Sequence, residues 1–210
     1  MALIKDAGPR GQYEKLLMSR GKKIIAGVDE AGRGPCAGPL VVAAVILKEI
    51  FHKDNNQIQD SKKIRENQRE PIYQYILENC LSYQILVISN DDIDKNGLQN
   101  SNIGGMKKVA SELSIKPEHV IFDGYKIEDF ELPSDGIWQG DQSCISVAAA
   151  SILAKVTRDK IMIEMDQKYP GYGFAKHKGY SAPAHMQAIA KLGLTPIHRK
   201  SFANIKEFIK

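Results

Sequence analysis

The sequence has little cysteine or tryptophan and no long apolar run. Three cysteines and one tryptophan occur in 210 residues. The cysteines (Cys36, Cys80 and Cys144) stand far apart, form no CxxC pair and leave an odd one over, which favours reduced structural thiols. The longest apolar run is too short to cross a bilayer. Residues 1–20 lack the apolar core of a signal peptide, so we expect a cytoplasmic protein with no membrane partner.

Composition and charge indicate a globular protein with a polyanionic partner. Hydrophobic residues make up 43% of the chain and charged residues 26%, and the length suggests one domain with a sizeable core. Residues 1–154 carry 18 basic and 21 acidic side chains, whereas residues 155–210 carry 11 basic and 4 acidic ones. A basic tail on an acidic body favours nucleic acid over a membrane. From charge alone, a merely solvated basic helix remains the alternative.

The pattern of apolar residues predicts a mixed α/β layer fold. Residues 24–29 and 40–47 are rich in β-branched side chains, and the intervening EAGRGPCAGP is turn chemistry, so an antiparallel hairpin with a wide connection is expected. Further strands are expected at 83–89 and 119–125, and helices at 61–80, 104–114, 144–169 and 184–193. Pro71 should delay the start of the first of these helices or kink it.

The glycine-rich turn of the hairpin does not fit a nucleotide-binding loop. A dinucleotide-binding loop needs a helix to open at its last glycine, but Gly38 is followed by Pro39 and a β-type run. A P-loop needs Lys and Ser or Thr after its final glycine, and this sequence has Pro39 and Leu40 there. Both phosphate-loop interpretations therefore fail on their context.

Four acidic residues stand beside apolar segments. Asp29 and Glu30 lie at the mouth of the first strand, Asp123 ends the strand at 119–125, and Asp141 precedes the alanine-rich helix. An Asp-Glu pair on an exposed turn is usually only solvated. Carboxylates gathered at strand ends would instead repel one another unless a cation joined them, and they suit Mg²⁺ or Mn²⁺ better than zinc. The spacing permits this convergence without proving it.

Several longer motifs together resemble one family. The stretches GVDEAGRGPCAGPLVVAAVIL, DSKK, IFDGY, GDQSCISVAAASILAKVTRD, HKGYSAPAH and HRKSF occur in order between about residues 22 and 202. In this order they resemble ribonuclease HII, the bacterial type 2 ribonuclease H. The first and fourth stretches are highly specific, whereas DSKK or HRKSF alone would mean little.

This resemblance implies a fold and a reaction. The expected fold is ribonuclease H-like, a mixed central sheet flanked by helices, in a single catalytic domain (1–210) with its core at about 22–168 and a helical, substrate-binding C-terminal part at about 169–210. The expected enzyme is a metal-dependent endoribonuclease that cleaves on the 5′ side of a ribonucleotide, in RNA–DNA hybrids and at single ribonucleotides in duplex DNA. Its products carry 3′-hydroxyl and 5′-phosphate ends. Two divalent cations would clamp the attacking water and the leaving oxygen.

The resemblance also implies which residues act. The four catalytic, metal-binding acids would be Asp29, Glu30, Asp123 and Asp141. The turn formed by Gly32, Arg33 and Gly34 would sense the ribose 2′-hydroxyl, which both donates and accepts hydrogen bonds. Tyr180 would pack its ring at the junction between ribonucleotide and deoxynucleotide; without the family, a ring buried under the preceding helix is the alternative.

Weaker predictions concern phosphate contacts. Ser61 and Lys62 are candidates, with a helix-capping serine and a solvated lysine as the alternative. Arg158 and Lys178 are candidates on the basic C-terminal part, with plain surface charge as the alternative. Gln139 stands where family members often have lysine, which puts a phosphate contact there in doubt. The histidines are not accompanied by other residues in a metal-ligand pattern, and they are expected to have no catalytic role.

Two other functions and two assembly questions stay open. Ribonuclease HIII is the nearest rival, but it typically carries an added N-terminal domain and lysine in the turn, where this chain has Arg33. A non-catalytic module that binds RNA–DNA hybrids should have lost at least one acid, and all four are present. We expect a monomer. At the C-terminus, Phe202, Ile205 and Phe208 are spaced for an apolar contact with a replication clamp, with a frayed helix end as the alternative.

Overall fold

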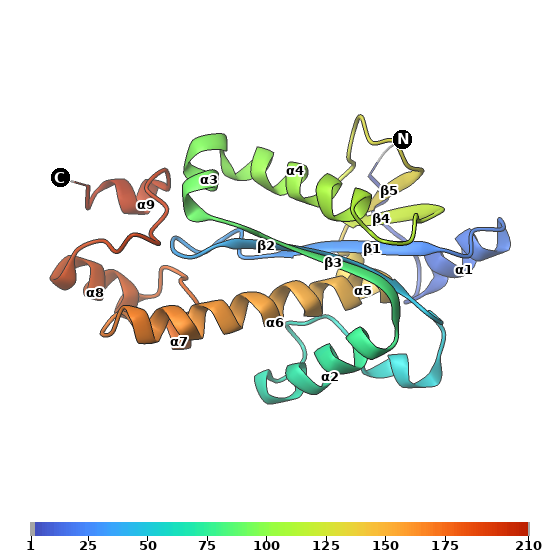
Figure 1. Cartoon of the computed structure of the whole chain (residues 1–210), viewed down its shortest axis with the longest axis horizontal. Helices are drawn as coiled ribbons and strands as arrows, with labels where there is room; N and C mark the ends of the chain where they lie inside the picture. Colours follow the sequence, from blue (N-terminus) through green and yellow to red (C-terminus); the bar gives the residue numbers. More distant parts are fainter. Residues whose placement is uncertain (1–2, 210) are drawn as a thin grey trace.

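A five-stranded mixed sheet forms the centre of the computed structural model, which describes residues 3–209 (Figure 1). The strand order is β3-β2-β1-β4-β5. β1 pairs antiparallel with β2, which pairs antiparallel with β3, while β1, β4 and β5 run parallel. The strands are β1 (Ile25–Ala31), β2 (Leu40–Leu47), β3 (Cys80–Ile88), β4 (His119–Asp123) and β5 (Ser134–Ile137). The expected hairpin of β1 and β2 is confirmed.

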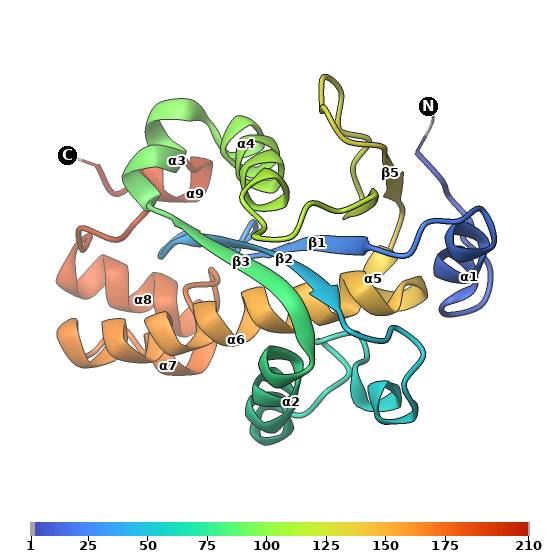
Figure 2. The ribbon, with the colours of Figure 1, turned by 45° about the vertical axis from the view of Figure 1, so that its right-hand side comes forward.

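Helices cover both faces of this sheet (Figures 1 and 2). One face packs against α4 (Leu98–Ser111), which follows α3 (Asn90–Asn96), and the other packs against α6 (Ile145–Lys168) and α2 (Glu66–Glu78). The remaining helices are α1 (Gln12–Ser19), η1 (Lys53–Gln57), α5 (Gly140–Ser143), α7 (Phe174–His177), α8 (Pro183–Leu192) and α9 (Ala203–Lys206). Within residues 3–209, no helix is both long and apolar enough to cross a membrane.

Small residues bring α6 close to the sheet. A Cβ at Gly27 of β1 would stand 2.1 Å from the backbone carbon of Ser146, so only glycine allows this approach. Ala148, Ala149 and Ala150 of α6 are fully buried in the same core. All eight residues of β2 are buried, as expected for a strand covered on both faces.

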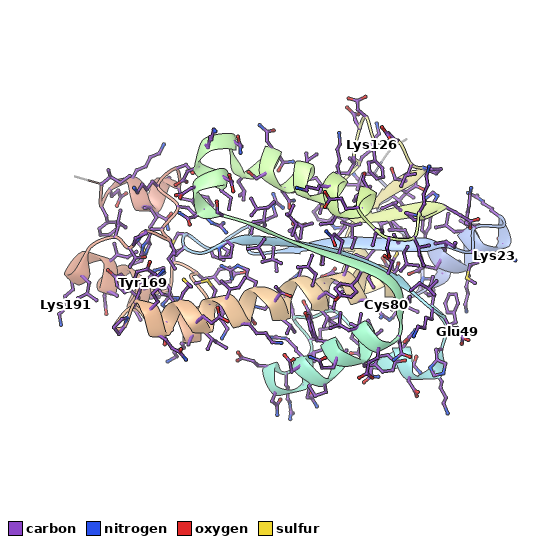
Figure 3. All side chains as sticks on the ribbon, in the orientation of Figure 1. Lys23, Glu49, Cys80, Lys126, Tyr169 and Lys191 are labelled. Atoms are coloured by element: carbon purple, nitrogen blue, oxygen red, sulfur yellow. The ribbon has the colours of Figure 1, made fainter. Side chains whose placement is uncertain are left out.

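The helical C-terminal part has a core of its own. Phe174, Ile189 and Ile205 form this core together with Cys36 and Ala37 from the connection between β1 and β2. Residues 169–209 therefore pack against the turn that follows β1. Figure 3 shows Tyr169 and Lys191 at this end of the molecule and Lys23 and Glu49 at the opposite end.

Several elements differ from the sequence-based predictions. The sequence predicted neither α1 nor α3, nor β5, whose SDGI sequence has no apolar alternation. β5 is held instead by pairing with β4 and by buried Asp135, which accepts hydrogen bonds from Tyr13 at 2.7 Å and pairs with His119 at 2.9 Å. The helix expected at 61–80 begins only at Glu66 and contains Pro71.

Candidate active site

The four acids converge from three elements. Asp29 and Glu30 lie at the end of β1, and Val28 pairs with Phe122 of the parallel strand β4, so Asp29 and Asp123 occupy neighbouring strand ends. Asp141 lies in α5, and Asp123 Oδ1 accepts hydrogen bonds from the Gly140 and Asp141 amides at 2.6 and 3.4 Å. The convergence that the spacing permitted is therefore present in the structure.

Strand geometry places the two neighbouring acids on opposite sides of the sheet. Side chains alternate along a strand, so Asp29 leaves β1 towards α6 and Glu30 towards α4. Burial raises the pKa of both carboxyl groups, and nearby Ser151 of α6 offsets part of this rise for Asp29, as Asn102 of α4 does for Glu30. Even so, Glu30 Oε2 and both amide atoms of Asn102 are buried without a hydrogen-bond partner.

Burial and mutual repulsion disfavour negative charge on these carboxyl groups. Burial, followed by the charges of Asp123 and Glu30, raises the pKa of Asp29 well above its usual value. Burial and Asp123 raise the pKa of Glu30 to about 7, partly offset by Arg33. Burial and Asp141 raise the pKa of Asp123 to about 6, against the amides of α5. Such a cluster is stabilised when positive charge is added to it.

Two basic side chains already contact the cluster. Lys62 Nζ lies 3.2 Å from Asp141 Oδ2, and Arg33 Nε lies 3.7 Å from Glu30 Oε1. Both basic side chains are substantially exposed (78% for Lys62 and 42% for Arg33), so they neutralise the buried charge only weakly.

The carboxylates fit hard divalent cations in chemistry and charge. Carboxylate oxygens are the ligands that Mg²⁺ and Mn²⁺ prefer, and the unpartnered Oε2 of Glu30 is one such donor. In residues 3–209 no three Asp, Glu, His or Cys side chains stand close enough to hold a metal ion as they lie. Asp123 is turned towards the α5 amides and Asp141 towards Lys62, so cation binding would require these side chains to rotate.

The glycine-arginine-glycine turn borders the acids. Together with Tyr180 it lines a cleft of about 460 Å³ that also contains Asp29, Glu30 and Asp123. Gly32 has φ +100°, and a Cβ there would stand 2.2 Å from Arg158 Nε. A Cβ on Gly34 would lie 3.3 Å from Tyr180 Cε1. Glycine at both positions therefore allows close packing on two sides of the turn.

Tyr180 stands on the rim of this cleft. Its side chain is 49% exposed, which contradicts the alternative of a ring buried under the preceding helix. Arg33 extends over the ring of Tyr125, with its guanidinium carbon 5.2 Å from the ring centroid. The ring of Tyr180 is thus exposed to solvent and lies close beside Gly34 of the turn.

Ser61 and Lys62 both reach the site. Ser61 is buried and its hydroxyl lies 3.0 Å from that of Ser151, so it is not the helix cap that the alternative proposed; α2 begins after Arg65. Lys62 is largely exposed, and its Nζ contacts Asp141 at 3.2 Å. Gln139, at φ +53°, lines a neighbouring cleft with Glu30 and Asp141.

Arg158 and Lys178 are buried rather than exposed at the surface, although Arg158 also lines the cleft. Both were predicted to offer charge at the surface, as phosphate contacts or as plain solvated groups, but they are 1% and 8% exposed. The Arg158 guanidinium donates to the carbonyls of Pro39 at 2.9 Å and Ala37 at 3.1 Å. Lys178 Nζ lies 2.9 Å from Glu66 Oε1. Their charges thus tie chain segments together.

Other basic residues around the cleft were not predicted from the sequence. Arg69 and Lys155 line it and share the carboxylate of Asp159, at 3.6 and 2.7 Å. Arg199 is fully buried and bonds to the turn itself. The motif HRKSF contained Arg199, but nothing in the residue order shows that position 199 lies beside positions 32–38.

Comparison with known proteins identifies the family. The family model described as Ribonuclease HII matches residues 26–205. The chain belongs to the ribonuclease HII family. A ribonuclease HII from Mycobacterium ulcerans is 44% identical over 202 residues, which cover 96% of this chain and 84% of that protein.

Solved structures of the family share the fold. Ribonuclease H2 from Pyrococcus horikoshii OT3 superposes with a TM-score of 0.77 at 27% identity, covering 89% of this chain and 97% of that one. Ribonuclease HII from Archaeoglobus fulgidus, solved in complex with PCNA, superposes with a TM-score of 0.74 at 26% identity. That match covers 84% of this chain and 94% of the other one. The ribonuclease H-like mixed sheet with its helical C-terminal part is confirmed. As a member of this family the chain is a nuclease with ribonuclease H activity, and the ribonuclease HIII alternative is set aside.

Proposed function

We propose that the chain hydrolyses the phosphodiester on the 5′ side of a ribonucleotide, in RNA–DNA hybrids and at single ribonucleotides embedded in duplex DNA. The products would carry 3′-hydroxyl and 5′-phosphate ends. One observation carries the proposal: four carboxyl groups, buried or partly buried, meet beside a cleft that also contains the glycine-arginine-glycine turn and Tyr180.

Asp29, Glu30, Asp123 and Asp141 would hold two divalent cations, Mg²⁺ or Mn²⁺. Bound there, the cations would supply an activated water and stabilise the negative charge of the transition state. The raised pKa values of Asp29, Glu30 and Asp123 support this assignment, because buried carboxylates that repel one another gain most from an added cation. Lys62 would leave Asp141 when a cation replaces it as the partner of that carboxylate.

The cleft would position the sugar at the ribonucleotide. Backbone groups of the turn can approach a 2′-hydroxyl closely because Gly32 and Gly34 carry no Cβ. Tyr180, half exposed beside Gly34, would pack its ring on the sugar at the junction. The scissile phosphate is then held over the acids, which is catalysis by positioning.

The duplex would be bound by the helical C-terminal part (about 169–210) together with Ser61 and Lys62. Arg69, Lys155 and Arg158 are the candidates for phosphate contacts because all three line the cleft, whereas Lys178 pairs with Glu66.

Contact with a replication clamp is a further element of the proposal. The Archaeoglobus fulgidus relative was solved in complex with PCNA. In this chain Ile205 is fully buried and Phe202 and Phe208 pack partly against the C-terminal core, whereas Ile209 is 47% exposed. A clamp would therefore contact the surface around Ile209, or would have to release α9.

The test uses two duplexes of one sequence, one with a single ribonucleotide and one entirely of DNA. Each is incubated with the protein in Mg²⁺, in Mn²⁺ or in EDTA. We expect nicking of the ribonucleotide duplex only, and only with a cation. Specific binding of the ribonucleotide duplex without cleavage in either metal would instead establish the non-catalytic module.

A further inference from the structure

Arg199 is buried beneath the connection between β1 and β2, and its guanidinium bonds twice to the glycine-arginine-glycine turn and once to Gly38. Its guanidinium donates to the carbonyls of Gly32 at 2.7 Å, Arg33 at 3.2 Å and Gly38 at 3.0 Å. Its backbone amide donates to Cys36 at 2.8 Å. The side chain is 0% exposed and forms no ion pair within residues 3–209. Burial lowers its pKa to about 9, so it is still charged at neutral pH.

This arrangement uses the geometry of arginine. A planar fork of five donors can hold several carbonyls in fixed relative positions, which a lysine ammonium on a flexible stem cannot. An uncompensated buried cation is costly, and here the carbonyl dipoles of one short turn take the place of a carboxylate. The shape of the turn therefore depends directly on Arg199.

The preceding residue, His198, is linked to Tyr180 through a second histidine. The Thr195 amide donates to His198 Nδ1 at 2.9 Å, which leaves the His198 proton on Nε2. His198 Nε2 then donates to His185 Nε2 at 3.1 Å, and His185 Nδ1 donates to the Tyr180 carbonyl at 2.8 Å. Burial lowers the pKa of His185 to about 4, so both rings can keep the neutral tautomers that this chain of hydrogen bonds requires.

Arg199 thus holds the turn, and His198, the residue before it, is linked to Tyr180 on the other side of the gap. An antiparallel bridge between Ala37 and His198 and the hydrogen bond from the Gly38 amide to the Ile197 carbonyl (2.9 Å) fix the same segment to the turn. The gap is narrow, since a Cβ on Gly34 would lie 3.3 Å from Tyr180 Cε1.

We propose that His198 and Arg199 form a positioning unit that sets the spacing between the turn and Tyr180, and thereby the selection of a ribonucleotide. The inference rests on the proposed function, in which the sugar of the ribonucleotide lies at this gap. Neither residue touches the reacting atoms. Their effect is on orientation, for which a misplacement of about 1 Å can cost roughly 100-fold in rate.

The test compares Arg199→Lys with Arg199→Met and with Lys116→Met, the control. Lys116 is exposed outside the cleft and outside the helical C-terminal part, and its replacement by Met removes the same charge. For Arg199→Lys we expect kcat on the single-ribonucleotide duplex to fall about 10- to 100-fold, with KM changed less than about threefold because phosphate contacts dominate affinity. The kcat of Arg199→Met should fall further, and Lys116→Met should match the parent.

Two readouts separate positioning from a general loss of structure. Amide hydrogen exchange should speed up in residues 31–39 of Arg199→Lys and stay unchanged in β2 and α6. In EDTA, the preference of the parent for the ribonucleotide duplex over the all-DNA duplex should shrink in Arg199→Lys. In a protein that already carries Tyr180→Ala, Arg199→Lys should lower kcat by a smaller factor than it does in the parent. The Tyr180 ring, against which the turn is positioned, is then already missing.

The outcomes also separate this inference from the proposed function. A parent protein that cuts neither duplex with any cation contradicts the proposed function, while the exchange measurement still tests the link between Arg199 and the turn. If the parent cuts and Arg199→Lys keeps its kcat and its preference, the positioning unit is refuted. Full additivity with Tyr180→Ala, or faster exchange spread evenly over the sheet, would also refute it.

Discussion

Replacing Glu30 by glutamine should stabilise the protein in the absence of metal. Burial and Asp123 raise the pKa of Glu30 from 4.5 to about 7, so holding its negative charge at pH 8 destabilises the folded state. A pKa difference of about 2.5 corresponds to about 3 kcal/mol. Part of that repulsion is shared with Asp123, so we expect about 1–3 kcal/mol from the neutral amide, or roughly 2–10 °C in melting temperature for a chain of this length.

The pH dependence gives this prediction its sign. A carboxyl group whose pKa is raised on folding contributes stability below its unfolded pKa, near 4.5, and loses it as the pH rises through about 7. Thermal unfolding in EDTA should therefore show a large stabilisation by Glu30→Gln at pH 8 and little at pH 5. Adding Mg²⁺ at pH 8 should stabilise the parent more than the variant, since the variant has lost one ligand.

Glu164→Gln is the matched control, because Glu164 is exposed on α6 far along the chain from the acids. It should change the melting temperature little at either pH. A Glu30→Gln protein that melts below the parent at pH 8, or that gains equally at pH 5 and pH 8, would refute the argument that repulsion among the acids is relieved by a cation.

Further substitutions at four positions test other parts of the account. Asp123→Asn or Asp141→Asn should lower turnover by several orders of magnitude without lowering the melting temperature; near-parental cleavage would show that the acid was wrongly assigned. Tyr180→Ala should lose most cleavage at a single ribonucleotide without much loss of stability, whereas Tyr180→Phe should keep much of it; unfolding of the alanine variant would contradict a role at the rim. Gly27→Ala should lower the melting temperature by about 4 °C or more, since its Cβ would stand 2.1 Å from the Ser146 backbone and overpacking costs about 1–3 kcal/mol or more; a parental melting curve would contradict the tight packing of α6.

The sequence predicted those features that depend on neighbouring residues in the chain. The apolar runs of β1 and β2 and the turn between them predicted the hairpin, and an acid directly after an apolar run placed Asp29 and Asp123 at strand ends. Whether these ends are neighbours depends on the parallel pairing of β1 with β4. That pairing is a property of the whole chain, so spacing alone left it open.

Buried cations were beyond the reach of sequence reasoning. An arginine in a basic segment looks like surface charge, and only the folded chain shows that Arg158 and Arg199 donate to carbonyls between positions 32 and 39. The histidines gave no metal-ligand pattern, and the hydrogen bonds from His198 through His185 to Tyr180 depend on contacts between separate helices and loops. Charge and residue type predict solvation, whereas topology decides which charges are enclosed.

The most direct test of the central claim is to map the cut at nucleotide resolution. A DNA duplex with one ribonucleotide, labelled at either end of the ribonucleotide-containing strand, is digested in Mg²⁺ or Mn²⁺ and its products are compared with synthetic markers of defined ends. The account predicts one nick on the 5′ side of the ribonucleotide, with a 3′-hydroxyl on the upstream fragment and a 5′-phosphate on the ribonucleotide. A cut on its 3′ side would contradict the proposed site of hydrolysis. A 2′,3′-cyclic phosphate formed there without metal would mean that the 2′-hydroxyl itself attacks and that the four acids do not act as proposed.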